Sequence, residues 1–383
     1  MNMPEIRFKD FKNEWKHFSF KEITYKAGIK NSENLSLESY SISNELGFIP
    51  QKEQFENGGT MSKADKRMYY IVSSNSFAYN PARINVGSLG YYQGIKDVIV
   101  SSLYEVFKTS DIVDDLFLLY WFKTNIFKRM IEQYQEGGVR LYFFFDKLQK
   151  CQIKIPSLQE QQKISSYFQK LDSLIQTTSK KLTSLKQIKA ASLQSMFPQE
   201  GETIPKVRFK GFEGEWKYEI LGRISSISIG EFVIQTKQRA NAPYPVYNGG
   251  ITNTGYYDYF NQEGPKIIIS ARGANAGFIS KYENRFWAGN SCYSIGINNN
   301  NWEFIYYFLQ SKQDSYLKEQ QAANIPSISK KQIYTTNVLL PCYNEQIKIG
   351  LFFSNLDKQI SLQTQRLEKL KQIKAACLDK MFV

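Results

Sequence analysis

The sequence has few residues from which a metal site or a histidine-dependent active site could be built. Its 383 residues include a single histidine, His17, and four cysteines, Cys151, Cys292, Cys342 and Cys377. These cysteines are far apart and none belongs to a C-x-x-C pair, whereas a structural zinc ion needs clustered ligands. We therefore expect no metal site, no catalysis by His17, and the reduced thiols that are typical of cytosolic proteins.

Long apolar runs and enzyme signatures are also missing. No stretch approaches the roughly 20 apolar residues of a membrane helix, and Met1–Asp10 carries four charged residues where a secretory signal has an apolar core. The segment closest to the Asn/Asp-Pro-Pro-Tyr/Phe run of adenine methyltransferases is NPAR at 80–83, which does not match. The run ARGANAG at 271–277 lacks the pattern of a phosphate-binding loop. The sequence thus predicts a cytoplasmic protein without catalytic residues.

Positive charge is plentiful. Lysine and arginine number 49 against 36 acidic residues, which gives a net charge of +13. Such an excess attracts polyanions, and nucleic acid is the usual one because neutralised phosphates release counterions. With 42% hydrophobic and 15% aromatic residues, the chain has enough material for folded cores. Its length suits two domains plus connecting elements.

The most informative feature is an internal duplication. Residues 4–16 read PEIRFKDFKNEWK and residues 205–217 read PKVRFKGFEGEWK, at an offset of 201. Residues 155–197 and 340–382 align without a gap at an offset of 185, and 20 of these 43 positions are identical. The segments between them, Phe18–Lys154 and Tyr218–Leu339, differ in length and over most of their sequence. Each half of the chain therefore combines a variable segment with a shared one.

The longer shared segments predict two long helices. Apolar residues recur with the 4-3-4 spacing of helices that pack along their length. They are Ile164, Phe168, Leu171, Ile175, Leu182 and Leu185 in the first copy, and Ile349, Phe353, Leu356, Ile360, Leu367 and Leu370 in the second. No proline or glycine interrupts Leu158–Met196, and Tyr343–Met381 contains only Gly350. We expect two antiparallel helices, each about 58 Å long, that form a coiled coil with pseudo-two-fold symmetry.

The repeat is also arranged in a circle. The block at 205–217 follows the first helix, and its copy at 4–16 opens the chain, which ends just after the second helix. A pseudo-two-fold arrangement would therefore place residues 4–16 against the end of the second helix, near Phe382. The link Pro198–Pro205, with two prolines and a glycine, should end the first helix.

The two variable segments read as mixtures of strands and helices. We expect strands at Val98–Val100, Ile267–Ile269 and Phe286–Trp287, and one helix in each segment, at Asp114–Glu136 and Trp302–Gln321. The pieces FLLYWFKT (117–124) and FIYYFLQS (304–311) occupy matching places, so the segments should share a fold.

The predicted fold class is α+β, with two α/β domains separated by the two long helices. The predicted boundaries are 1–154 for the first domain, 155–197 for the first helix, 198–339 for the link and second domain, and 340–383 for the second helix.

Several loops of the variable segments are rich in Asn, Gln, Arg, Lys and Gly. Asparagine and glutamine pair with adenine edges, and arginine and lysine with guanine edges, although Gly and Asn are also plain turn formers. The turn at 271–277 should expose Arg272 between two strands. The candidate DNA contacts are Lys63, Lys66, Arg67, Arg83 and Arg140 in the first segment, and Lys237, Arg239, Asn248, Arg272 and Asn275 in the second.

Over essentially its whole length the sequence resembles the specificity subunits of type I restriction–modification enzymes. The resemblance rests on the paired blocks IPSLQEQQKI and LPCYNEQIKI, each followed by LD and then by LKQIKAA and MF. The blocks RFKDFKNEWK and RFKGFEGEWK belong to it, as do YPVYNGGITNTGYYDYF and IIISARGANAGFI in the second segment.

The resemblance implies two target-recognition domains, each reading half of a split, asymmetric DNA site, with the helices setting the gap. It implies as partners two modification subunits, which methylate adenine with S-adenosylmethionine, and restriction (motor-nuclease) subunits that use ATP and Mg²⁺. No cofactor is expected in this chain.

Two other classes of protein remain open from the residues. A scaffold would use the two domains to bind other proteins, and it would lack salt-sensitive, sequence-selective DNA binding. A stand-alone methyltransferase or nuclease would act on DNA with S-adenosylmethionine or Mg²⁺ alone.

Overall fold

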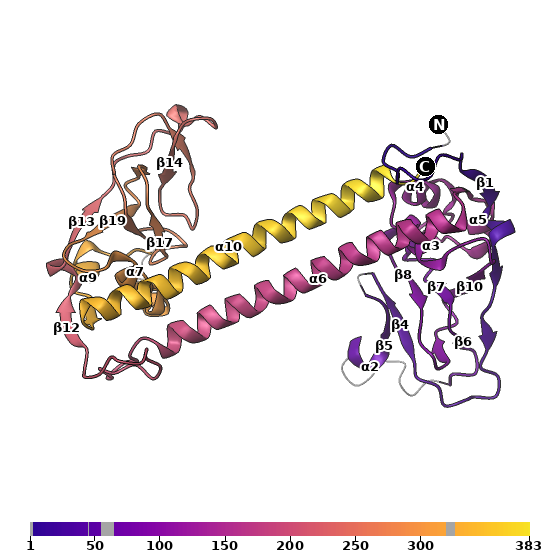
Figure 1. Ribbon diagram of the computed structural model, residues 1–383, viewed down its shortest axis with the longest axis horizontal. Helices are drawn as coiled ribbons and strands as arrows, with labels where there is room; N and C mark the ends of the chain where they lie inside the picture. The colour runs from indigo at the N-terminus through magenta and orange to yellow at the C-terminus, as the bar shows by residue number, and fades with distance from the viewer. Residues whose placement is uncertain (1–2, 45, 55–64, 319–325) are drawn as a thin grey trace. The chain divides into compact units, whose positions relative to one another are not determined.

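The computed structural model describes residues 3–44, 46–54, 65–318 and 326–383 (Figure 1). The chain divides into two compact units, the first made of Met1–Thr178 with Arg366–Val383, and the second of Ser179–Gln365. Two helices of 38 residues, α6 (Leu158–Ser195) and α10 (Tyr343–Lys380), each contribute to both units. Within the described ranges, no helix has the length and apolar character needed to cross a membrane.

The two predicted long helices are confirmed to within one residue. Each starts where expected, at Leu158 and Tyr343, and ends one residue early, at Ser195 and Lys380. In the first copy the predicted seam is buried at every position except Ile175, which is half-buried. In the second copy it is buried from Ile349 to Leu356 and half-buried beyond. The 4-3-4 pattern therefore marks the face that packs, while the coiled coil itself stays a prediction.

The described residues of the first unit form four groups of strands. Strand β1 (Lys16–Ser19) pairs antiparallel with β11 (Gln152–Ile155), which joins the two ends of the variable segment. A four-stranded sheet has the order β2-β10-β7-β8, a three-stranded sheet the order β3-β6-β9, and β4 and β5 form a hairpin. The bounds are β2 Thr24–Lys26, β3 Ile29–Lys30, β4 Tyr40–Ser43, β5 Gly47–Pro50, β6 Tyr70–Val72, β7 Ser76–Tyr79, β8 Leu89–Tyr92, β9 Val98–Val100 and β10 Glu105–Thr109.

The second unit repeats this plan with different detail. Strand β12 (Lys217–Ile220) pairs with β20 (Asn337–Leu340) as β1 pairs with β11. A four-stranded sheet has the order β13-β19-β16-β17, and a three-stranded sheet the order β15-β14-β18. The bounds are β13 Ser225–Ile229, β14 Tyr244–Tyr247, β15 Gly255–Tyr257, β16 Lys266–Ser270, β17 Ile279–Tyr282, β18 Trp287–Ala288 and β19 Cys292–Ile297. The three strands predicted from sequence correspond to β9, β16 and, shifted by one residue, β18.

Each helix predicted inside a variable segment is in fact two helices. The first breaks into α3 (Asp115–Trp121) and α4 (Asn125–Tyr134), because Thr124 caps a new helix by accepting from the Phe127 N–H. The second breaks at Lys312 into α7 (Trp302–Ser311) and α8 (Gln313–Lys318), and residues 319–321 of that prediction lie outside the described residues. The shorter helices are α1 (Phe20–Ile23), α2 (Gln51–Gln54), α5 (Phe145–Lys150) and α9 (Lys330–Tyr334), with 3₁₀ turns η2 (Ile84–Val86), η3 (Leu221–Arg223) and η4 (Gln235–Lys237).

The opening block lies where the repeat predicts, at the end of the second helix. In the first unit the Ile6 N–H donates to the Lys380 carbonyl at 3.0 Å, and both chain ends are drawn at this place (Figure 1). In the second unit the Val207 N–H donates to the Ser195 carbonyl at 2.9 Å. The two bonds join equivalent positions of the two copies. The circular arrangement is therefore confirmed at the level of hydrogen bonds.

An arginine in each block then reaches the start of the other helix. The Arg7 guanidinium donates to both Glu160 oxygens at 2.7 and 2.8 Å, and Arg208 does the same to Glu345 at 2.7 and 2.8 Å. The glutamate side chains are 2% and 0% exposed, so these are buried, bidentate ion pairs. Each block thus ties the end of one long helix to the beginning of the other.

A glutamine beside each glutamate fastens the variable segment. The Gln161 Oε1 accepts from the Asp114 N–H at 2.8 Å, and the Gln346 Oε1 accepts from the Asn301 N–H at 3.0 Å. Asp114 and Asn301 are the caps of α3 and α7. The Glu-Gln pair in each shared block therefore explains why both variable segments attach to the long helices in the same way, although their sequences differ.

Candidate nucleic-acid interface

In the first unit, Arg83 lies beside a polar hollow of about 360 Å³. Asn80 precedes the arginine, and the Asn80 Oδ1 accepts from the Ala82 N–H at 3.0 Å, which holds the turn into η2. The hollow is lined by Ser41, Ile42, Ser43, Asn44, Gln54, Asn80, Arg83, Ser88 and Tyr104. Arg83 is exposed, so a cation stands among amides and hydroxyls. These are the groups that recognise base edges in DNA.

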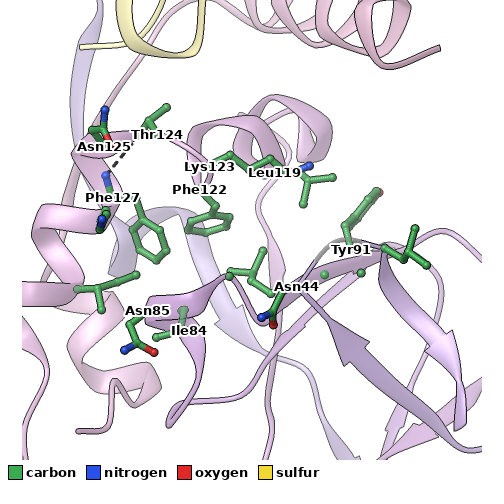
Figure 2. A pocket seen from close by; sticks show the side chains of 17 residues that line it. Asn44, Ile84, Asn85, Tyr91, Leu119, Phe122, Lys123, Thr124, Asn125 and Phe127 are labelled. Carbon is green, nitrogen blue, oxygen red and sulfur yellow. Dashed lines mark hydrogen bonds between the residues drawn. The ribbon is translucent and has the colours of Figure 1, made fainter. Parts of the chain in front are cut away.

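A second hollow of about 430 Å³ adjoins the first and shares Asn44 with it. Figure 2 shows the rings of Phe122 and Phe127 side by side, with Ile84 below them and the side chains of Asn85 and Asn44 on either side of Ile84. The ring centroids are 4.7 Å apart. Lys123 and Lys128 belong to the lining, and none of its residues is acidic. The hollow therefore has an apolar floor, an amide edge and a positive charge.

The other candidates of the first segment are more scattered. Arg67 is ion-paired with Asp65 at 2.6 Å, so DNA would have to compete for its guanidinium. Lys66 is half-buried, and Lys63 lies outside the described residues. Arg140 is exposed on a turn closed by reciprocal hydrogen bonds between Glu136 and Tyr142 at 2.9 and 2.8 Å.

The turn that carries Arg140 depends on a glycine. Gly137 has a φ of +133°, and a Cβ there would lie 2.1 Å from the Arg140 carbonyl oxygen. Only glycine adopts this conformation without strain, so Gly137 fixes the direction in which Arg140 leaves the surface.

In the second unit, the structure brings together three of the five candidates. Arg272 is exposed on the turn between β16 and β17, as predicted. Its neighbour Gly273 has a φ of +86°, and Asn275 lies half-buried in the same turn, where its carbonyl accepts from the Phe278 N–H. Asn248 lies against the same turn, because the Ala271 N–H donates to the Ser291 carbonyl and the Ser291 N–H to the Asn248 Oδ1.

These contacts leave Asn248 and Arg272 with different groups available to a ligand. The Asn248 amide oxygen already accepts a backbone N–H, at 3.0 Å, which leaves its NH₂ group as the donor for a ligand. Arg272 is the strongest candidate for a guanine contact here, because it is exposed on a turn fixed by backbone bonds on both sides.

Lys237 and Arg239 lie elsewhere in the second unit, around a hollow of about 590 Å³. Arg239 is ion-paired with Asp258. Aromatic side chains line the same hollow: Phe232, Tyr257, Tyr259 and Trp287. Phe232 and Tyr259 are 73% and 72% exposed. Exposed aromatic rings beside cations provide stacking surfaces as well as charge.

The sequence analysis did not predict the β4–β5 hairpin, which Asn44 adjoins, and it did not select Asn85, Lys123 or Lys128 as candidates. The signal was present, because the turn residues at 44–47 (NELG) separate two short runs of strand-forming residues. It was obscured by the polar character of SIS and the proline after FI. Lys123 and Lys128 fall inside the single helix predicted over 114–136, whereas in the structure Thr124 caps a new helix between them.

The cysteines inside the two domains serve packing. Burial raises the pKa of the Cys151 and Cys292 thiols to about 12, so both stay protonated at neutral pH and are poor nucleophiles. Both side chains are fully buried.

Comparison with known proteins supplies the family. A model described as the type I restriction modification DNA specificity domain matches residues 13–187 and again 213–372. A curated relative from Mycoplasma genitalium, named as a type I specificity subunit, is 24% identical over 185 residues, which cover 45% of this chain. The match spans about half the length of that relative, 48%.

Solved structures agree on the fold. The crystal structure of a type I restriction–modification S subunit from M. genitalium has a TM-score of 0.68 at 17% identity, covering 100% of this chain and 99% of that one. A structure described as the basis of assembly and conformational transition of the type I R-M system has a TM-score of 0.52 at 15% identity, covering 96% and 97%. Because the family model matches most of the sequence, once in each half, the chain belongs to the family of type I restriction–modification DNA specificity domains.

Proposed function

We propose that this chain is the non-catalytic specificity subunit of a type I restriction–modification complex and reads a bipartite, asymmetric DNA sequence. The proposal rests on one observation. The two variable segments differ from each other, yet both are attached to the long helices by equivalent contacts. Each unit has its own sheets and loops, yet the Arg–Glu and Gln contacts that hold them are the same. Two readers with different surfaces would recognise two different half-sites.

The proposed readers are the loops around Arg83 in the first unit and the turn of Arg272 in the second. Both arginines are exposed, and in each case amide side chains stand nearby, Asn44 and Asn80 beside Arg83, and Asn248 and Asn275 beside Arg272. Guanine and adenine edges are the natural ligands of such sets. The net charge of +13 would add phosphate contacts that strengthen binding to any duplex.

The chemistry would belong to partners. We propose that two modification subunits bring S-adenosylmethionine for adenine methylation, and that restriction subunits bring ATP and Mg²⁺ for cleavage. No residue of this chain is proposed to bind these cofactors. The complex would act in the cytoplasm, where the host DNA lies.

Selection from a pool of random DNA duplexes tests the proposal. The chain, co-purified with its modification subunits, should enrich one split sequence with a fixed gap, and its affinity should fall steeply with salt. Binding without sequence preference, or binding that salt leaves unchanged, would instead favour the scaffold alternative. Methylation by this chain alone would overturn its non-catalytic role.

A further inference from the structure

The same four-residue junction occurs once in each unit, where the variable segment meets the two long helices. A tyrosine comes from α3 or α7, a phenylalanine and an aspartate from the first half of one long helix, and a lysine from the second half of the other. We call it the Tyr–Phe–Asp–Lys junction. Its members are Tyr120, Phe168, Asp172 and Lys374 in the first unit, and Tyr307, Phe353, Asp357 and Lys189 in the second.

In the first unit, the Asp172 carboxylate receives two donors from two different elements. The Tyr120 hydroxyl donates to one oxygen at 2.9 Å, and the Lys374 ammonium donates to the other at 2.5 Å. The Tyr120 ring stacks on Phe168 with centroids 4.9 Å apart at 27°. One carboxylate on α6 therefore connects α3 with α10.

The second unit repeats this geometry. The Tyr307 hydroxyl donates to Asp357 at 2.7 Å, and Lys189 donates to the other oxygen at 2.6 Å. The Tyr307 ring stacks on Phe353 with centroids 5.0 Å apart at 30°. Here the carboxylate lies on α10 and connects α7 with α6.

The tyrosine is the informative member, because it belongs to the variable segments. Those segments diverge over most of their length, yet Tyr120 and Tyr307 fall at the same place of FLLYWFKT and FIYYFLQS. Burial, followed by the effect of the neighbouring aspartate, raises the pKa of both hydroxyls. Each hydroxyl therefore stays protonated and donates to its aspartate at neutral pH.

The Gln161 and Gln346 hydrogen bonds hold each variable segment at the cap of α3 or α7. Apolar packing around that point would still let the segment pivot, because apolar contacts have little directional preference. Hydrogen bonds to a charged acceptor are short and directional. With both oxygens engaged, the aspartate fixes α3 or α7 both along and around the long helices.

From this geometry we infer that the Tyr–Phe–Asp–Lys junction is the positioning element that sets how each DNA-reading domain is held on the helices, and thereby how strictly the gap between the two half-sites is measured. The inference rests on the proposed function and deepens it. The junction residues are positioning residues, and none of them is expected to touch DNA.

A change in gap length alters both the distance and the rotation between the two half-sites. One added base pair moves a half-site by about 3.4 Å along the duplex and turns it by roughly 35° about the axis. A domain that can rotate on the long helices can still reach a half-site displaced by one base pair. A domain held by directional hydrogen bonds cannot. Removing hydrogen bonds from the junction should therefore reduce the preference for the correct gap length over other lengths. The sequence recognised at each half-site should stay unchanged.

The test uses the complex with its modification subunits and duplexes that keep both half-sites while the gap varies from two base pairs too short to two too long. Tyr120→Phe combined with Lys374→Met removes both donors to Asp172. We expect the preference for the correct gap over its neighbours to fall about tenfold, with half-site specificity retained. Lys374→Arg, which keeps the ion pair, should preserve the preference.

Lys163→Met is the matched control, because it removes an exposed lysine of α6 that pairs with Asp10 at 3.5 Å and takes no part in the junction; its gap preference should equal that of the wild type. The milder Tyr120→Phe alone covers the case in which the double variant does not fold, with a smaller loss in the same direction. If gap preference stays intact in folded junction variants, or if binding falls equally at every gap, the junction is not a positioning element. If the wild type itself shows no split site, the proposed function fails and the inference with it.

Discussion

Replacing Arg208 with alanine should destabilise the second unit strongly, because it leaves a buried charge without its partner. The Glu345 side chain is 0% exposed and accepts two hydrogen bonds from Arg208, whose own side chain is 15% exposed. The same guanidinium also donates to the Gly214 and Glu213 carbonyls. Its loss therefore frees the block at 205–217 from the start of α10.

The expected loss in the free energy of unfolding follows from the cost of leaving a buried carboxylate without its partner. Breaking a buried ion pair by removing one partner costs about 3–5 kcal/mol. We expect about 3 kcal/mol, near the lower end, because the arginine keeps some contact with solvent. For a unit of this size, each kcal/mol corresponds to a shift of about 2–4 °C in Tm, so the second unit should unfold roughly 6–12 °C lower.

Calorimetry of the wild type, Arg208→Ala and the paired variant Arg208→Met with Glu345→Leu measures this directly. The paired variant should recover most of the loss, because it removes the charge together with its partner. Arg7→Ala, at the equivalent pair with Glu160, should lower the stability of the first unit by a similar amount. An Arg208→Ala protein as stable as the wild type would refute the argument that these pairs hold the blocks in place.

Three further results are expected. A circular permutant with joined termini and new ends between Gln199 and Glu202 should fold and bind DNA, because Ile6 and Val207 make equivalent bonds to the helix ends; a permutant that does not fold would contradict this. Arg83→Ala and Arg272→Ala should each cost about 1–3 kcal/mol in DNA binding and relax specificity at one position, as read by selection from random duplexes, whereas a uniform loss with a smaller salt slope would mean phosphate contact instead. Insertions of whole helical turns in both α6 and α10 should change the gap between half-sites and leave the half-sites intact, as mapped by methylation; a changed half-site sequence would count against a spacer role.

The shared parts of the fold were predictable because their signals are local and repeated. The heptad spacing of Ile164, Phe168 and Leu171 recurs at Ile349, Phe353 and Leu356, and all six side chains are buried. The position of the opening block followed from the order of the repeat alone. Neither prediction required knowledge of how the variable segments fold.

The variable segments were harder because tertiary contacts override their local patterns. The helix break at Thr124 depends on a side-chain cap within an otherwise continuous apolar pattern, and the β4–β5 hairpin alternates too weakly to stand out. Loop composition pointed to Arg83 and Arg272, and both are exposed. It could not reveal that Arg67 and Arg239 are ion-paired or that the Asn248 oxygen is already engaged, since those partners are settled only by folding.

If the two domains read DNA independently, exchanging one of them should change only its own half of the recognised sequence. Residues 18–154 would be replaced by the matching segment of a relative with a different target, keeping Tyr120 and the shared helices. Methylated adenines would then be mapped across the genome of cells that also carry the modification subunits. We expect one half of the methylated sequence to change while the other half and the gap remain. A swap that alters both halves at once would contradict it.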